Sequence, residues 1–148
     1  MLVQPLSPDR FSARPIADLA DLSVARQEFA SWLRALDVDH ETIDDLLVVM
    51  SELGANAVRE SPAEGRLPTL EAELDAEGIH VDVANEVDVE AERRANDRWD
   101  LEDPLRTGGR GLVVVSALMD DVDVEVDGLR LHVRCTKAID GQDGSTVT

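Results

Sequence analysis

The sequence predicts an α+β fold: a two-layer α/β sandwich in which three helices cover one face of a mostly antiparallel sheet. Two observations support this prediction. Two segments repeat apolar residues at three- and four-residue steps, as amphipathic helices do, and a third short segment is almost wholly apolar. Two pairs of segments alternate apolar and charged residues around a short turn, as antiparallel hairpins with one buried face do. The predicted order is helix, helix, strand, strand, loop, helix, strand, strand.

The first twenty residues contain Pro5, Pro8 and Pro15. Because proline fixes φ and has no N–H to donate, we expect extended chain here, at most an edge strand. The first helix is predicted over Leu22–Leu36, with Asp21 able to cap its start. Its apolar stripe consists of Leu22, Ala25, Phe29, Trp32, Leu33 and Leu36.

A second and stronger helix is predicted from about Glu41 to Glu60, opened by Asp39. Acidic residues in its first turns suit the positive end of the helix dipole. The pair Ser61-Pro62 ends it, because a residue before proline avoids the helical region. Its apolar stripe consists of Ile43, Leu46, Leu47, Met50, Leu53 and Ala57.

The rest of the chain is predicted to form two hairpins and one short helix. One hairpin covers residues 70–83 with a turn at Asp75–Gly78, and the other covers 122–135 with a turn at Asp127-Gly128. Between them, residues 87–108 have no periodicity, and loops of this length are often lids or binding loops. The almost wholly apolar residues 111–119 are predicted to be helical.

Length and composition fit one globular domain. The chain has 148 residues, of which 43% are hydrophobic and 31% charged, close to an ordinary globular chain. A domain of this length buries about two thirds of its unfolded surface, so it needs no disulfide or metal to fold. We expect the domain to span residues 1–138 and residues 139–148 to form a disordered polar tail.

The charge excludes several classes of partner. The chain carries 14 Lys and Arg against 32 Asp and Glu, for a net charge of −18. Such a surface repels phosphates and anionic lipids, so we expect neither direct nucleic-acid binding nor membrane binding. The sequence contains no apolar run of about 18 residues and no signal-peptide pattern near its start. These features predict a cytoplasmic protein.

Several common catalytic motifs are absent from the sequence. It contains no P-loop and no dinucleotide-binding fingerprint. The single cysteine, Cys135, excludes an intrachain disulfide and a thiolate zinc cluster, and its surroundings favour a small core residue. His40, His80 and His132 lie in three different elements, so no histidine metal cluster is expected.

The second predicted helix contains the segment Ser51-Glu52-Leu53-Gly54-Ala55-Asn56-Ala57. Glu52 and Asn56 are four residues apart, so their side chains lie on one helix face. A carboxylate can act as a general base, and an amide oxygen can bind Mg²⁺. Taken alone, the same pair is also an ordinary polar helix surface.

A glycine-rich segment, Thr107-Gly108-Gly109-Arg110-Gly111-Leu112, opens the third predicted helix. Glycines let the backbone approach a ligand closely, and the free N–H groups at a helix start bind phosphate. Arg106 and Arg110 add positive charge in a very acidic chain. Taken alone, this segment is equally consistent with a flexible loop before a helix.

The order and spacing of the two motifs together resemble the Bergerat ATP-binding fold of gyrase-type ATPases and histidine kinases. The resemblance is closest to the bacterial anti-sigma factor serine/threonine kinases, and it covers about residues 10–136. Residues 51–57 look like the family's N box, Glu-Leu-x-x-Asn-Ala. Residues 109–120 look like its second glycine box, and Asp103-Pro104-Leu105-Arg106 is similar to the end of its lid.

The resemblance implies roles for these residues. Glu52 would be the general base that takes the proton from a substrate serine or threonine. Asn56 would bind the Mg²⁺ that bridges the phosphates of ATP. The residues that would surround the triphosphate are Arg106, Gly109, Arg110 and Gly111. Phosphoryl transfer needs mainly positioning and charge neutralisation, so such a small set of residues is chemically sufficient.

The sequence departs from the family in the first glycine box. There the family has an Asp that accepts a hydrogen bond from the adenine amino group, followed two residues later by a Gly. Aligning residues 79–83 with the preceding strand puts Asn85 at the Asp position and Val87 at the Gly position. Asn85 can still accept through its side-chain oxygen, but a neutral acceptor makes a weaker bond. Val87 adds a branched side chain where glycine leaves room.

Three hypotheses follow for the function. The first is an ATP- and Mg²⁺-dependent anti-sigma factor kinase, which phosphorylates an anti-anti-sigma partner of the STAS type and sequesters a sigma factor. The second is a non-catalytic, partner-binding regulator on the same fold, with weak or lost ATP binding, and Asn85 and Val87 favour it. The third is an acidic interaction domain of unrelated fold. Relatives often act as homodimers, so a homodimer is one expected assembly.

Overall fold

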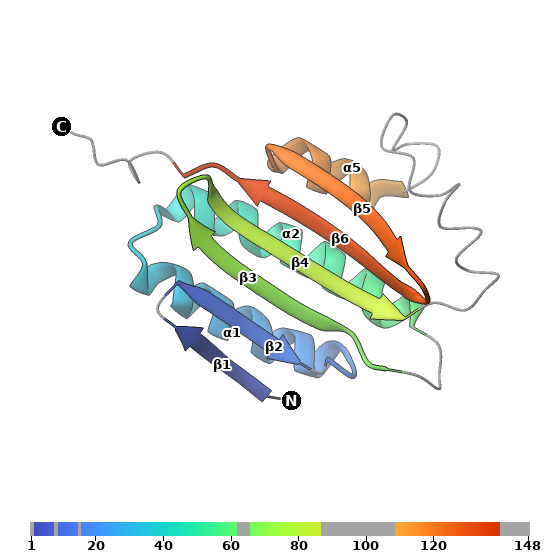
Figure 1. The fold of residues 1–148 in the computed structure, drawn as a ribbon. Helices are drawn as coiled ribbons and strands as arrows, with labels where there is room; N and C mark the ends of the chain where they lie inside the picture. The colour runs from blue at the N-terminus through green and yellow to red at the C-terminus, as the bar shows by residue number, and fades with distance from the viewer. Residues whose placement is uncertain (1, 8, 15, 62–65, 87–108, 140–148) are drawn as a thin grey trace.

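One antiparallel sheet and three helices make up the described part of the computed structural model (Figure 1). The structure describes residues 2–7, 9–14, 16–61, 66–86 and 109–139. Within these residues all three helices lie on the same face of the sheet, and the opposite face has no helix on it. The predicted α+β two-layer sandwich is therefore confirmed.

The sheet has the strand order β1-β2-β3-β4-β6-β5, and every neighbouring pair is antiparallel. The elements along the chain are β1 (Leu2–Ser7), β2 (Arg10–Arg14), α1 (Leu19–Ala35), α2 (His40–Glu60), β3 (Thr69–Asp75), β4 (Gly78–Glu86), α5 (Gly109–Leu118), β5 (Asp121–Asp127) and β6 (Arg130–Lys137). Strand β6 lies between β4 and β5. The hairpin of β5 and β6 therefore pairs with the hairpin of β3 and β4 through β6.

The expectation of at most an edge strand in the first twenty residues was wrong. Strand β2 lies inside the sheet, where it pairs with β1 on one side and with β3 on the other. It contains no proline, and its residues Phe11 and Ala13 are 2% and 0% exposed. Pro5 lies instead on β1, at the edge of the sheet, where a missing N–H is tolerated.

Helix α1 begins three residues earlier than the predicted Leu22 because Asp18 is its N-cap. The Asp18 carboxylate accepts a hydrogen bond of 2.9 Å from the N–H of Asp21, and Asp21 in turn accepts one of 2.9 Å from the N–H of Ala17. The first bond satisfies an N–H group that the first helical turn leaves without a partner, and the second ties the residue before the cap to the helix. Asp21 therefore supports the cap from inside the helix.

The other predicted elements agree with the structure to within a few residues. Asp39 is the N-cap of α2, and this helix ends at Glu60 as expected. The first hairpin turns at Ala76–Glu77, between β3 and β4. The second turns at Gly128–Leu129, one residue later than predicted, and Gly128 has a φ of 64°.

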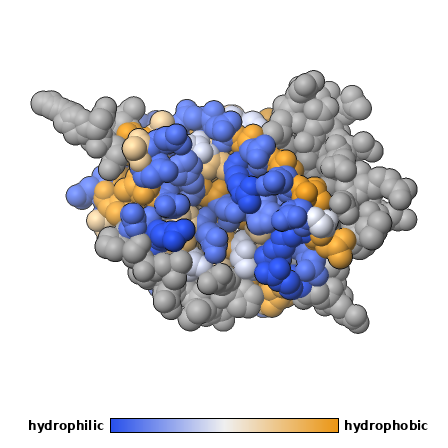
Figure 2. All heavy atoms as spheres, in the orientation of Figure 1, coloured by the Kyte–Doolittle hydropathy of each residue, from blue (hydrophilic) through white to orange (hydrophobic). Residues whose placement is uncertain are grey.

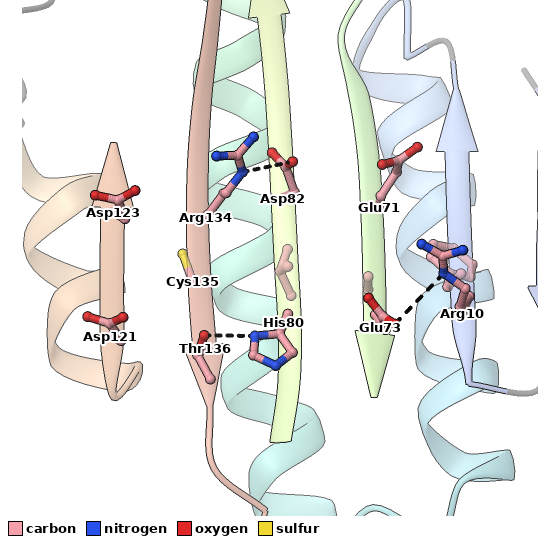
Figure 3. Close-up of a pocket in the computed structure, with 13 residues that line it drawn as sticks. Arg10, Glu71, Glu73, His80, Asp82, Asp121, Asp123, Arg134, Cys135 and Thr136 are labelled. Carbon is pink, nitrogen blue, oxygen red and sulfur yellow. Dashed lines mark hydrogen bonds and ion pairs between the residues drawn. The ribbon is translucent and has the colours of Figure 1, made fainter. Parts of the chain in front are cut away.

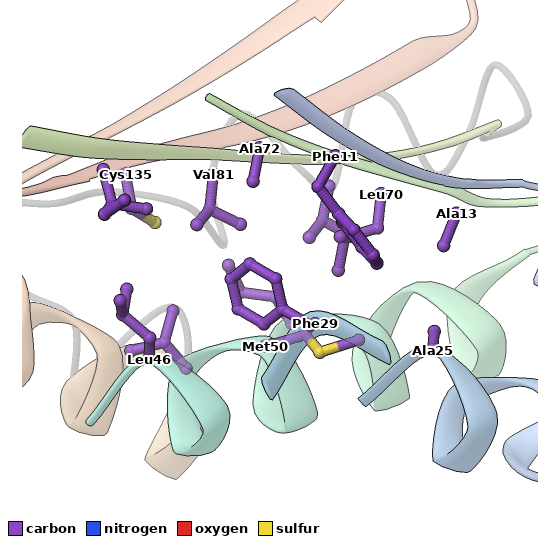
Figure 4. Close-up of a cluster of buried hydrophobic side chains, with 14 of the residues drawn as sticks. Phe11, Ala13, Ala25, Phe29, Leu46, Met50, Leu70, Ala72, Val81 and Cys135 are labelled. Carbon is purple, nitrogen blue, oxygen red and sulfur yellow. The ribbon is translucent and has the colours of Figure 1, made fainter. Parts of the chain in front are cut away.

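The core lies between the sheet and the helices (Figure 4). Phe11 from β2 points toward Phe29 and Trp32 of α1, with ring centroids 5.4 and 5.7 Å away. Cys135 is 2% exposed on β6, so its predicted place in the core is confirmed. The largest fully buried side chains are Phe11, Ile16, Phe29, Leu33, Leu46, Val49, Met50, Leu70, Ile79, Val81 and Val115.

Helix α1 packs against α2 at Gly54 through the side chain of Leu22. A Cβ added there would lie 2.4 Å from Cδ1 of Leu22, so only glycine fits without a shift of that side chain. Gly54 lies between Glu52 and Asn56, so the turn of α2 that carries these two polar residues packs against α1. None of the helices in the described residues is both long and apolar enough to cross a bilayer.

Candidate functional site

The Glu52–Asn56 turn of α2 presents both predicted site residues on a half-buried surface. Leu53, Gly54 and Ala57 are buried in the core, which turns the other side of the helix outward. The side-chain oxygen of Asn56 accepts a hydrogen bond from the guanidinium of Arg59, one turn further along. The oxygen that the sequence predicts to bind Mg²⁺ is therefore already in contact with a cationic side chain.

Asn85 lies near the end of β4 on the face of the sheet that the helices cover. It follows Ile79, Val81 and Val83 at two-residue steps, so it shares their core-facing side of the strand, and it is only 4% exposed. Its side-chain amide donates a hydrogen bond of 3.2 Å to the carbonyl of Glu86. Asn85 therefore places a buried polar side chain between the end of β4 and the helices.

Lys137 contacts both α2 and α5, and these contacts show how the two helices are oriented. Its Nζ donates a hydrogen bond of 2.7 Å to the carbonyl of Leu118, the last residue of α5, and lies 3.5 Å from a carboxylate oxygen of Asp45 in the first half of α2. The end of α5 therefore lies beside the start of α2. Since the two helices pack together, the start of α5 lies toward the second half of α2.

The same lysine relates α2 to β4. Lys137 pairs with Ile79 at the start of β4, so Asp45 lies near this end of the strand. Asn56 follows Asp45 by about 16 Å of helix, and Asn85 follows Ile79 by about 20 Å of strand. Asn56 and Asn85 therefore lie toward the same end of the sandwich, and so does the start of α5 at Gly109 (Figure 1).

Three of the segments that the sequence singled out lie toward one end of the sandwich, and the others lie outside the described residues. The predicted helix over 111–119 is observed as α5, which begins at Gly109, so Gly109, Arg110 and Gly111 form its first turn. Arg106, Val87, the predicted lid and all of the predicted tail except Ile139 lie outside the described residues. The groups toward this end of the sandwich that a ligand can contact are the carboxylate of Glu52, the amides of Asn56 and Asn85, and the N-terminus of α5.

Two surface hollows lie away from these residues. One, of about 390 Å³, is on the open face of the sheet. The other, of about 550 Å³, lies beside the turn between α1 and α2 and includes Asp45 and Lys137 in its lining. Neither is lined by Glu52, Asn56 or Asn85, so neither coincides with the predicted nucleotide site.

Sequence reasoning missed two residues that shape this region. Arg59 follows Asn56 at the three-residue spacing of helical neighbours, a signal that was available in the sequence. Lys137 connects three elements that are far apart along the chain, and no local pattern marks it. The sequence also did not indicate that Asp75, Glu77 and His80 lie together, with ligand-type atoms within 4.8 Å of one another.

The architecture is that of an ATPase-type domain. It is a two-layer sandwich, and toward one end it carries a polar turn of the second helix, a buried amide at a strand end and a glycine-rich helix start. The chain belongs to the histidine kinase-like ATPase domain family, which its sequence matches over residues 16–137. The resemblance to this fold stated from the sequence is thereby confirmed. No curated protein matches the chain.

Two solved structures show the same fold. The crystal structure of the RsbU and RsbW domains of Rv1364c from Mycobacterium tuberculosis matches with a TM-score of 0.67 and 18% identity, over 88% of this chain and 32% of that one. This chain thus spans about a third of that protein's length. The SiaB-SiaC complex from Pseudomonas aeruginosa matches with a TM-score of 0.62 and 14% identity, over 88% of this chain and 89% of that one.

Proposed function

We propose that this chain is an ATP-binding regulator of the anti-sigma factor kinase type. The observation that supports this most directly is that Glu52, Asn56, Asn85 and the start of α5 lie toward one end of the sandwich. In this proposal the protein phosphorylates a serine or threonine on an anti-anti-sigma partner of the STAS type. It also sequesters a sigma factor, and it acts in the cytoplasm.

The donor set at this end fits the hard cation that ATP brings with it. Asn56 offers an amide oxygen on a half-buried side chain, and oxygen is the ligand that Mg²⁺ prefers. Asn56 would hold the ion, which when bound supplies charge neutralisation to the phosphates. The first N–H groups of α5, together with Arg106 and Arg110, would hold the triphosphate.

The chemical step assigned to this chain centres on Glu52. Its carboxylate takes the proton of the substrate hydroxyl as the hydroxyl oxygen forms a bond to the γ-phosphorus. The bond from that phosphorus to the β–γ bridging oxygen breaks, and ADP leaves with the electron pair. Asn85 orients the nucleotide by accepting a hydrogen bond from its adenine amino group.

Calorimetric titration with Mg·ATP tests the nucleotide site. We expect binding by the wild type, and loss of most of it in Asn56→Ala. Gln27→Ala removes an exposed amide from α1 and serves as the matched control, with an expected affinity equal to that of the wild type. Equal binding by Asn56→Ala and the wild type would show that Asn56 is not part of the site.

Transfer of labelled γ-phosphate to a STAS-type partner tests the base. Glu52→Gln keeps the shape of the side chain and removes its basicity, so we expect it to bind Mg·ATP but to transfer phosphate at least about a hundredfold more slowly. Glu28→Gln, an exposed position on α1, is the control and should retain the wild-type rate. A wild-type rate in Glu52→Gln would refute the role of Glu52.

A second candidate function is a non-catalytic, partner-binding regulator on the same fold. The observation that favours it is the neutral Asn85, where the resembling family has an acidic acceptor. This candidate predicts no binding at millimolar ATP and a partner complex that is indifferent to nucleotide. Gain of ATP binding in Asn85→Asp would then identify the substituted residue as the reason for the loss.

A further inference from the structure

The open face of the sheet carries two adjacent rows of polar side chains that cross five strands from β2 to β5 (Figure 3). Each row is formed by residues that are paired across neighbouring strands, so their side chains stand side by side on this face. The first row is Arg10, Glu73, His80, Thr136 and Asp121. The second row is Ser12, Glu71, Asp82, Arg134 and Asp123.

All the residues of these two rows except Ser12 line a hollow of about 390 Å³. Figure 3 shows Glu71, Glu73 and Arg10 on one side of it and Asp121 and Asp123 on the other. Hydrophilic residues cover the middle of this face, as Figure 2 shows. This surface is hollowed and has charged side chains along its borders. It can therefore surround part of a ligand, which a flat charged surface cannot do.

Both arginines that line the hollow already have carboxylate partners. Arg134 lies 3.3 Å from a carboxylate oxygen of Asp82 and also binds Glu125. Arg10 lies 4.0 Å from Glu73. The carboxylates outnumber these cations, so the hollow keeps an excess of negative charge.

Strand β5 contributes the part of this excess that is easiest to reach. Its acidic residues alternate with half-buried valines, which turns the carboxylates of Asp121, Asp123 and Asp127 toward the open face. In the described part of the chain no ion pair is seen for these three. Successive carboxylates on one strand face lie about 7 Å apart, which is also the spacing of every second side chain in an extended peptide.

The sign of the charge selects the class of ligand. Nucleic acids and anionic lipid surfaces carry negative charge and are repelled. A second copy of the chain would bring the same excess of carboxylates to the interface, which is unfavourable. A segment rich in lysine or arginine supplies the complementary charge, and its long side chains can reach into a polar hollow.

We propose that the hollow on the open face of the sheet, which extends from Arg10 and Glu71 to Asp121 and Asp123, is a docking surface for an extended, lysine- or arginine-rich segment of a protein partner. The segment lies along the sheet and places alternate basic side chains against the carboxylates of β5. This surface is on the face of the sheet opposite the helices, and Glu52 and Asn56 are both on helix α2. The inference therefore goes beyond the proposed nucleotide site and does not depend on it.

Fluorescence anisotropy with a labelled peptide of alternating lysine and serine tests the surface. The variant pair Asp121→Asn and Asp123→Asn removes two charges from the open face without changing the size of the side chains. We expect roughly tenfold weaker peptide binding at low salt in this double variant, because each exposed charge contact is worth a factor of a few. Circular dichroism checks that the fold is intact.

A matched control separates docking from the general attraction of an acidic protein for a basic peptide. Glu28→Gln with Asp44→Asn removes the same charge from exposed positions on α1 and α2. We expect this control to bind the peptide within about twofold of the wild type. Equal weakening in both double variants would mean attraction by net charge alone, and would overturn the proposal.

Backbone amide shifts in an NMR titration with the same peptide locate the contact. We expect the largest shifts on β4, β5 and β6 around Asp82, Arg134 and Asp123. Shifts confined to the helices would overturn the proposal. So would shifts on β5 and β6 that change with protein concentration in the absence of peptide, because these report self-association. Asn56→Ala should bind the peptide as the wild type does, so failure of the nucleotide site leaves this test valid.

Discussion

The guanidinium of Arg59 donates a hydrogen bond to the side-chain oxygen of Asn56, three residues earlier on α2. Under the proposed function this is the oxygen that binds Mg²⁺. A cation and a hydrogen bond donor therefore compete for the same acceptor, since a guanidinium next to the metal is repelled by it. Under the same proposal, Arg59 would weaken metal-dependent nucleotide binding, which a substitution can test.

Arg59→Ala should tighten Mg²⁺-dependent ATP binding by roughly two- to fivefold, because the broken contact is an exposed, charge-assisted hydrogen bond. Calorimetry at several Mg²⁺ concentrations measures the change. Arg26→Ala, an exposed arginine on α1, is the control for loss of one positive charge. Weaker ATP binding in Arg59→Ala would instead mean that the guanidinium contacts the phosphates.

Gly78→Ala should destabilise the fold far more than Gly128→Ala. Gly78 has a φ of 133°, and a Cβ there would lie 2.2 Å from the backbone carbonyl oxygen of Lys137. Gly128 also has a positive φ, of 64°, but open space surrounds its Cβ position. We expect losses in the free energy of unfolding of about 3 kcal/mol and about 1 kcal/mol, respectively. Urea denaturation measures both, and equal losses would contradict the close approach at Lys137.

Stability should depend on pH through Asp75. The hydrogen bond from His80 is the main cause that holds the pKa of this carboxyl below its ordinary value of 3.8. A pKa depressed in the folded state gives a stabilising contribution that is complete above the unfolded pKa and is lost as the pH falls below it. The wild type should thus exceed Asp75→Asn in stability near neutral pH, with a difference that shrinks below about pH 4.

Urea unfolding of both proteins across the acidic range measures this difference. His80→Gln removes the partner of the carboxyl and should show a similarly reduced loss of stability in acid. A difference between the wild type and Asp75→Asn that stays constant from neutral pH down to pH values well below 3.8 would exclude this linkage.

Cys135 should be inert toward thiol reagents in the folded protein. Burial is the main cause that raises the pKa of its thiol to about 12, and the residue is 2% exposed. Only a small fraction is thiolate at mildly alkaline pH, and the thiolate is the reactive form. We expect the rate of modification by an aromatic disulfide reagent to follow unfolding and to rise sharply in urea. Rapid modification without denaturant would show that β6 opens locally.

The sequence by itself determined the class of fold and most of its elements. Apolar residues at helical spacing predicted α1 and α2, and alternation predicted the two hairpins from β3 to β6. It also pointed to Glu52, Asn56 and the glycines at the start of α5, through residue patterns that are local. Such patterns succeed because each records which face of one element is buried.

Only the tertiary structure decided which elements are neighbours. The interior position of β2, the pairing of β4 with β6 and the reach of Lys137 to both Leu118 and Asp45 depend on contacts between distant parts of the chain. The rows on the open face arise in the same way, from the register of five strands. Periodicity fixes a buried face, whereas strand order and register are set by long-range hydrogen bonds and core packing, which no local pattern encodes.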